Sequence, residues 1–112
     1  MDRSQSFNAP PYFDGSNYAF WKVRMRAFLC SIDEAVWDAV EIGWIRLEAA
    51  KYKWDKAALA ASNANSKALN AIFCGVSLDE FHRISYITIA KEAWQILETM
   101  YKGMKKVKYT KL

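Results

Sequence analysis

The chain has 112 residues, enough for one hydrophobic core but too few for two independently folded domains. Apolar residues make up 53% of it and aromatic residues 15%, which excludes a disordered chain and leaves more large rings than so small a core encloses. The formal net charge is +4, but five lysines and no acid lie between residues 102 and 112. The basicity is therefore a property of the C-terminal tail.

The cysteines and the histidine predict no metal site. Cys30 and Cys74 lie far apart and neither is near His82, the only histidine, so zinc has no ligand set. Apolar residues bracket both cysteines, which predicts buried thiols in a reducing compartment. No stretch resembles a signal peptide or is long enough for a membrane span. We expect a cytoplasmic protein that contacts no membrane and carries no metal or other cofactor.

The chain divides into a flexible N-terminal segment, residues 1–12, and a single helical domain, residues 13–112. Pro10 and Pro11 favour an extended segment, which leads into a turn at residues 14–16. Asn17 is the expected N-cap of a first helix that ends near residue 32. Its apolar residues recur at helical spacing and its outer face is basic, at Lys22, Arg24 and Arg26.

A capping box at Ser31 to Glu34 predicts the start of a second helix, which should stop at Gly43. Residues 44–47 then form a short apolar link. From Leu47 to Cys74 there is neither glycine nor proline and alanine is frequent, so we expect one long helix or two nearly collinear ones. Its weak point is the polar stretch 62–66. The large side chains that should anchor it are Trp54, Leu59, Leu69, Ile72 and Phe73.

Two further helices complete the predicted fold. Gly75 ends the long helix, and a second capping box, Ser77 to Glu80, opens a short one. Thr88 is the expected cap of the last helix and Gly103 its end. The β-branched residues at 84–89 weakly suggest a strand, but the run is too brief. The prediction is an all-α protein, a compact bundle of about five helices.

No catalytic constellation is recognisable. A lone histidine lacks a nucleophile and an orienting partner, and His82 should face solvent. The pairs Asp33 with Glu34 and Asp79 with Glu80 lie inside the capping boxes, which explains them structurally. The glycines stand singly, so there is no phosphate-binding loop. We therefore predict neither an enzyme nor a small-molecule substrate.

Two sets of residues are candidates for contacts with partners. Aromatic side chains at Tyr12, Trp44 and Tyr52 are not explained by the predicted core, and such residues are enriched at protein interfaces. The tail combines phosphate-neutralising lysines with an aromatic ring that could stack on a base, at Lys102, Lys105, Lys106, Lys108, Tyr109 and Lys111. The competing interpretation, which we favour, is a solvated helix face.

The segment Phe13 to Trp21 resembles the opening motif of plant copia-type retrotransposon gag polyproteins, Phe-x-Gly-x-Asn-Tyr-x-x-Trp. Four further blocks follow in the family's order and spacing, so that the resemblance covers about residues 11–112. The residues of this chain that carry it are Phe13, Gly15, Asn17, Tyr18, Trp21, Trp37, Trp54, Trp94 and Tyr101.

The resemblance implies a fold like a capsid N-terminal domain, which packs with itself and with other gag chains into a virus-like particle around element RNA. The family usually continues into further capsid helices and a zinc knuckle, and neither is present in this sequence. No RNA-binding residue is therefore carried over. A fragment retained by a host genome could still dock onto intact gag, and interfere with its assembly.

We weigh three functions. A self-associating structural module, most simply a dimer, comes first. Binding of nucleic acid through the lysine tail is the second, and a helical adaptor that binds a protein or peptide is the third.

Overall fold

The computed structural model describes residues 9–110, with side chains up to Lys102. Five α-helices and one short 3-10 helix follow in the order α1 (Tyr18–Ile32), α2 (Glu34–Glu41), η2 (Lys51–Lys53), α3 (Lys56–Cys74), α4 (Leu78–Ile84) and α5 (Ala90–Thr110). The described residues contain no strand and a single isolated bridge, between Phe13 and Val76. The predicted all-α bundle of about five helices is confirmed.

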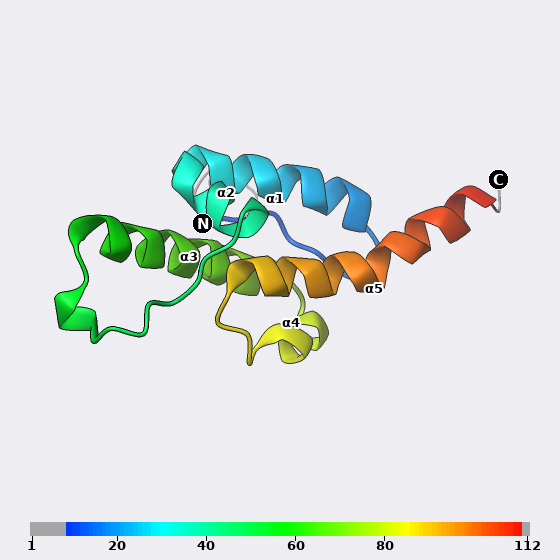
Figure 1. Cartoon of the computed structure of the whole chain (residues 1–112). Helices are drawn as coiled ribbons and strands as arrows, with labels where there is room; N and C mark the ends of the chain where they lie inside the picture. The colour runs from blue at the N-terminus through cyan, green and yellow to red at the C-terminus, as the bar shows by residue number, and fades with distance from the viewer. Residues whose placement is uncertain (1–8, 111–112) are drawn as a thin grey trace.

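The helices pack around one core (Figure 1). Helices α1 and α2 lie over one side of α3 and α5, and α4 lies on the other side. The connection between α2 and α3 loops out at one end of the molecule, whereas the last turns of α5 extend past the body at the other end. Eight large, fully buried side chains form the centre of the core: Phe13, Trp21, Met25, Leu29, Val36, Ile72, Ile84 and Leu97.

Helix α1 has the predicted length and the predicted buried face, with Tyr18, Trp21, Met25 and Leu29 turned inward. Its start differs from the prediction, because the Asn17 side chain makes no capping hydrogen bond to the helix. The amide of Asn17 instead bonds backward to the turn before the helix.

The capping box predicted at Ser31 is wrong. Ser31 lies inside α1, where its hydroxyl donates to the carbonyl oxygen of Phe28 (2.6 Å). Asp33 caps α2 instead, because its carboxylate accepts from the Ala35 amide (2.9 Å). The end of α2 is as predicted, since Gly43 takes up a φ of +106° just after the last turn.

The prediction of a helix from Leu47 is wrong over its first part. Residues 43–50 are irregular, η2 forms one turn, and α3 begins only at Lys56. The Asp55 carboxylate accepts from the Ala58 amide (2.8 Å) and so fixes this start. Trp54 does not anchor α3, because its indole N–H donates to the Ala49 carbonyl (2.9 Å) and it packs on its own loop.

Helix α3 runs without interruption through the polar stretch 62–66. Ala64, Ala68 and Ala71 are buried, and these small side chains let neighbouring helices approach closely, as expected. Asn65 in the same stretch is 3% exposed and reaches across to α5, with bonds to the Thr88 carbonyl and the Ala90 amide. The predicted anchor Leu59, by contrast, lies on the surface.

Phe13, the first residue of the predicted helical domain, and Pro11 before it both make hydrogen bonds to later parts of the chain. The Phe13 amide donates to the Gly75 carbonyl (2.7 Å), and the Ser77 amide donates to the Phe13 carbonyl (3.1 Å). The Trp21 indole donates to the Pro11 carbonyl (3.0 Å). Residues 1–8 of the predicted flexible segment lie outside the described residues.

The last two helices are only partly as predicted. Gly75 ends α3 and Ser77 precedes α4, but the Ser77 side chain makes no capping bond. Of the residues 84–89 that weakly suggested a strand, Ile84 ends α4 and the others form a turn and a loop. Thr88 does not cap α5, because Asn65 of α3 performs that role. Helix α5 also continues through Gly103, since one glycine weakens a helix by about 1 kcal/mol without ending it.

Candidate functional site

The first block of the family-like motif forms a turn. Asp14 accepts from the amide and hydroxyl of Ser16 (2.9 and 2.7 Å), and these bonds lower the pKa of the Asp14 carboxyl. Asn17 accepts from the Asp14 amide and donates to the Tyr12 carbonyl (both 3.3 Å). Gly15 has a φ of +100°, which disfavours any side chain there. These residues act locally, by turning the chain into α1.

The motif aromatics join into one cluster between α1, α2 and α5. The Trp21 ring lies 5.4 Å from Phe13 and 5.6 Å from Trp94, and Trp94 in turn meets Trp37 edge-on at 5.4 Å. Tyr101 continues the cluster from α5, 4.8 Å from Phe13. Trp54 lies outside this cluster, beside Arg46 (5.0 Å). The motif residues therefore serve mainly to hold the fold together.

A polar bridge links α1 to α5 at the edge of this cluster. The Tyr18 hydroxyl donates to Glu98, whose carboxylate also lies 3.0 Å from the Lys22 ammonium. The Tyr18 bond, followed by Lys22, lowers the pKa of Glu98, although partial burial opposes them. Burial and the neighbouring Glu98 raise the pKa of Tyr18 well above its usual range.

The burial of Glu80 contradicts the prediction that both acids of the pair on α4 only stabilise the start of that helix. Its side chain is 7% exposed, so it does not serve a solvent-exposed helix start. Arg83 Nε lies 3.7 Å from Glu80 Oε1, longer than a hydrogen bond. Burial, helped by Glu80, raises the pKa of Tyr101 to about 12.

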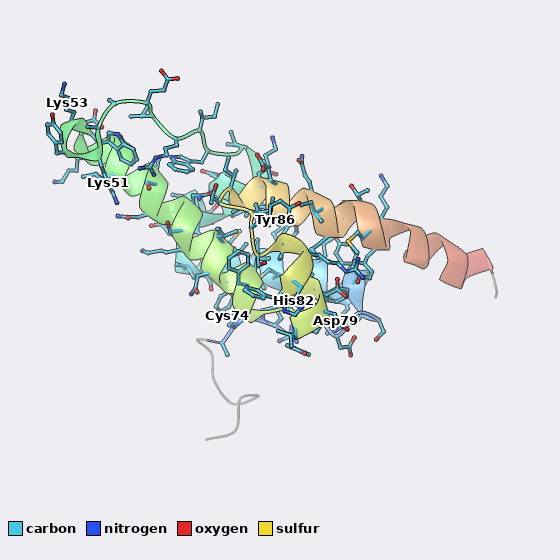
Figure 2. The ribbon with its side chains drawn as sticks, turned by 90° about the horizontal axis from the view of Figure 1, so that it is seen from below. Lys51, Lys53, Cys74, Asp79, His82 and Tyr86 are labelled. Atoms are coloured by element: carbon cyan, nitrogen blue, oxygen red, sulfur yellow. The ribbon has the colours of Figure 1, made fainter. Side chains whose placement is uncertain are left out.

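The histidine and the cysteines do not gather into a site. His82 is exposed, as predicted (Figure 2). Cys30 is half-buried and Cys74 is exposed, so the prediction of two buried thiols is wrong. Cys74 is the last residue of α3, and its Sγ lies 3.7 Å from Oδ1 of Asn70 in the turn before it. Among the described residues no three His, Cys, Asp or Glu side chains are placed to hold a metal ion.

An apolar groove lies between α2 and the first half of α3, with a volume of about 390 Å³. Trp44 stands at its border and also lines an adjoining groove beside α5. Alanines form the α3 wall, at Ala57, Ala60, Ala61 and Ala64, and the α2 wall includes Asp38 and Ile42. Because the side chains on α3 are small, a second helix could approach this wall closely. We name this feature the Trp44 groove.

Large apolar side chains that lie open to solvent line the Trp44 groove and the adjoining groove, or follow them in the chain. Ile42 is 69% exposed and Ile45 87% exposed, and Leu47 follows on the same connection. Of the three aromatics predicted as interface residues, Tyr12 and Tyr52 are exposed and Trp44 is half-buried. Exposed apolar side chains in such density are typical of surfaces that bind another protein.

A second apolar surface lies on the outer side of α1. Phe20 is 63% exposed and Val23 67% exposed, and Ala19 and Ala27 extend the same stripe. Arg24 stacks on the Phe20 ring at 5.4 Å, so the stripe is bordered by positive charge. Sequence reasoning missed this surface, because the inward-facing residues of α1 dominate its apolar pattern.

Two lysines lie at the end of the molecule formed by η2. Lys51 and Lys53 point outward from η2, far from Tyr86 and His82 (Figure 2). Lys53 lies 5.9 Å from the ring of Tyr52, which is 85% exposed between the two lysines. Lys102 of the predicted tail is exposed; the side chains of Lys105, Lys106, Lys108 and Tyr109, and Lys111 as a whole, lie outside the described residues.

Comparisons of the chain with protein-family models, with curated proteins and with solved structures find no match. Within residues 9–110, no helix combines the length and the apolar composition needed to cross a bilayer.

Proposed function

We propose that this chain is a structural, self-associating helical domain of the type found at the start of copia-type gag proteins, either encoded by an element or retained by a host. One observation carries the proposal: the Trp44 groove and its surroundings are apolar and uncovered. Exposure of Ile42 and Ile45 to water is unfavourable in free energy, and association with another apolar surface would bury these side chains.

The same proposal accounts for the motif residues without assigning them a chemical role. The motif turn and the ring cluster around Trp21 hold α1 against α5, which leaves the outer stripe of α1 and the Trp44 groove facing outward. A scaffold of this kind supplies fixed surfaces for assembly. The shared motif and the order of its blocks support placing the chain beside gag proteins rather than among other helical domains.

Light scattering after size-exclusion chromatography tests the proposal, with the unmodified chain run over a range of concentrations, at low and high salt, with and without short single-stranded RNA. We expect species heavier than the 12.9 kDa monomer that form without RNA and persist at high salt, because salt does not weaken apolar contacts. A strict monomer that gains mass only with RNA at low salt would refute self-association.

A second candidate function, binding of single-stranded nucleic acid, is favoured by Tyr52 and its flanking lysines. An exposed ring between two cations provides a stacking surface and phosphate contacts together. The test is fluorescence anisotropy with labelled RNA and the Tyr52→Ala variant, beside Tyr86→Ala as the matched control. Tyr86 is 73% exposed and has no lysine next to it in the sequence. Equal affinities of the two variants would exclude Tyr52 as a contact.

A further inference from the structure

The Trp44 groove and the α1 stripe differ in shape and in charge. The groove is a hollow bordered by α2 and α3, whereas the stripe is an exposed face of α1, which we call the ridge; Ala19 and Val23 also line a small hollow of about 110 Å³ at its edge. We define the ridge by Ala19, Phe20, Val23 and Ala27, all of them exposed. Phe20 and Val23 are the large side chains that project from it. In one molecule the ridge and the groove are on different helices and do not meet.

Charges beside the two surfaces are opposite in sign. On α2, Asp38 lines the groove. Glu34 precedes Asp38 by four residues and Glu41 follows it by three, so all three acids lie on the same side of the helix. All three acids are exposed. The α3 wall contributes no acid, because residues 56–74 contain none. The groove is thus negative along its α2 border.

The ridge carries positive charge along both borders. At helical spacing, Arg24 and Arg26 lie on opposite sides of the stripe formed by Phe20 and Val23. Both arginines are exposed, and neither forms an ion pair with another described residue. Arg24 rests on the Phe20 ring at 5.4 Å, and Arg26 on the Trp37 ring at 5.3 Å. Either border can therefore face the acids of α2.

We propose that the Trp44 groove binds the α1 ridge of a second copy of this chain, with Phe20 and Val23 seated against the alanine wall. The proposal rests on the self-association proposed above and names its two surfaces. The contact is heterologous, because each copy uses a different surface at each of its two contacts. Such contacts can repeat from copy to copy. Two copies that exchange both contacts close into the dimer expected from the sequence, and other relative orientations produce larger rings or an open filament.

Two complementary variants test the pairing of these surfaces. Phe20→Ser with Val23→Ser removes the ridge, and Ala61→Arg fills the groove at an exposed position that suits a long side chain. Leu78→Ser, at a 68% exposed site on α4, is the control for loss of an exposed apolar side chain. Ser66→Arg, also exposed on α3 but away from the groove, is the control for the added charge.

Each variant alone should be monomeric at concentrations at which the wild type and both controls associate, with association weakened at least tenfold. A mixture of the two in equal amounts should form a species of twice the monomer mass that does not grow, because only one ridge and one groove remain intact. This outcome also shows that both variants are folded.

Three results would overturn the proposal. A mixture that stays monomeric means that the two surfaces are not partners. Single variants that associate like the wild type show that self-association uses other surfaces, and then only the present inference fails. A wild type that is monomeric at every concentration refutes the proposed function, and this pairing with it.

Discussion

Asn65 is the buried polar residue whose removal gives the most specific test of how the fold is held together. It is 3% exposed in the middle of α3. Its amide nitrogen donates to the Thr88 carbonyl (2.8 Å), and its amide oxygen accepts from the Ala90 backbone N–H (2.9 Å). Through these two bonds α3 caps the start of α5, and we predict that Asn65→Ala destabilises the chain.

The size of this destabilisation follows from the two backbone groups that would lose their partner, the Ala90 N–H and the Thr88 carbonyl. Ala90 is fully buried, so its N–H would lose its partner without access to water, at a cost of about 1–3 kcal/mol. Thr88 is exposed, and water can partly replace the bond to its carbonyl, so its share is about 1 kcal/mol. We therefore expect a loss of about 2–4 kcal/mol, a large part of the roughly 5–15 kcal/mol that stabilises a domain.

Urea denaturation followed by tryptophan fluorescence measures this loss, with Asn63→Ala as the matched control. Asn63 is exposed two residues earlier in the same helix, and its replacement changes stability by a few tenths of a kcal/mol at most. Hydrogen exchange of the Ala90 amide should also accelerate in Asn65→Ala alone. The reasoning is refuted when the two variants differ by less than about 0.5 kcal/mol.

Three further predictions concern packing, pH and thiol chemistry. Gly75→Ala would place a Cβ 2.7 Å from the Pro11 carbonyl oxygen. We expect this clash to lower the free energy of unfolding, measured in urea, by about 1–3 kcal/mol. An unchanged midpoint of urea unfolding would contradict the packing described. Because folding lowers the pKa of Glu98 below 4.5, the Glu98 carboxylate stabilises the fold fully above that pH, and this stabilisation is lost as the pH falls further. Glu98→Gln should therefore weaken the loss of thermal stability in acid. A pH profile identical to that of the wild type would argue against the bridge. Cys74 is exposed and Cys30 half-buried, so a thiol reagent should modify Cys74 first, as peptide mapping would reveal; faster modification of Cys30 would contradict the burial of α1.

Local patterns in the sequence predicted those elements whose signals are themselves local. The spacing of Trp21, Met25 and Leu29 predicted the buried face of α1, and Gly43 marked the end of α2, because a positive φ at that point favours glycine. The prediction of a capping box at Ser31 was wrong. The start of α2 depends on a side chain other than Ser31: Asp33 takes the extended conformation between the two helices, and its carboxylate caps α2.

Features that depend on distant residues could not be predicted. The partners of Asn65 lie 23 and 25 residues further along the chain, so no local window distinguishes it from a surface asparagine. The same holds for Glu80, whose burial depends on contacts made by the folded chain as a whole. Tyr12, Trp44 and Tyr52 are not among the buried core residues, and their role at an interface stays a prediction, whereas the ridge on α1 was found only in the structure.

Dilution calorimetry at several temperatures tests the central claim, self-association through apolar surfaces, most directly. Injection of concentrated protein into buffer should give a heat of dissociation that falls off as protein accumulates in the cell. The derived heat of association should become more exothermic as temperature rises, which is the mark of apolar burial. A heat of dilution that matches buffer alone at every temperature would contradict the claim.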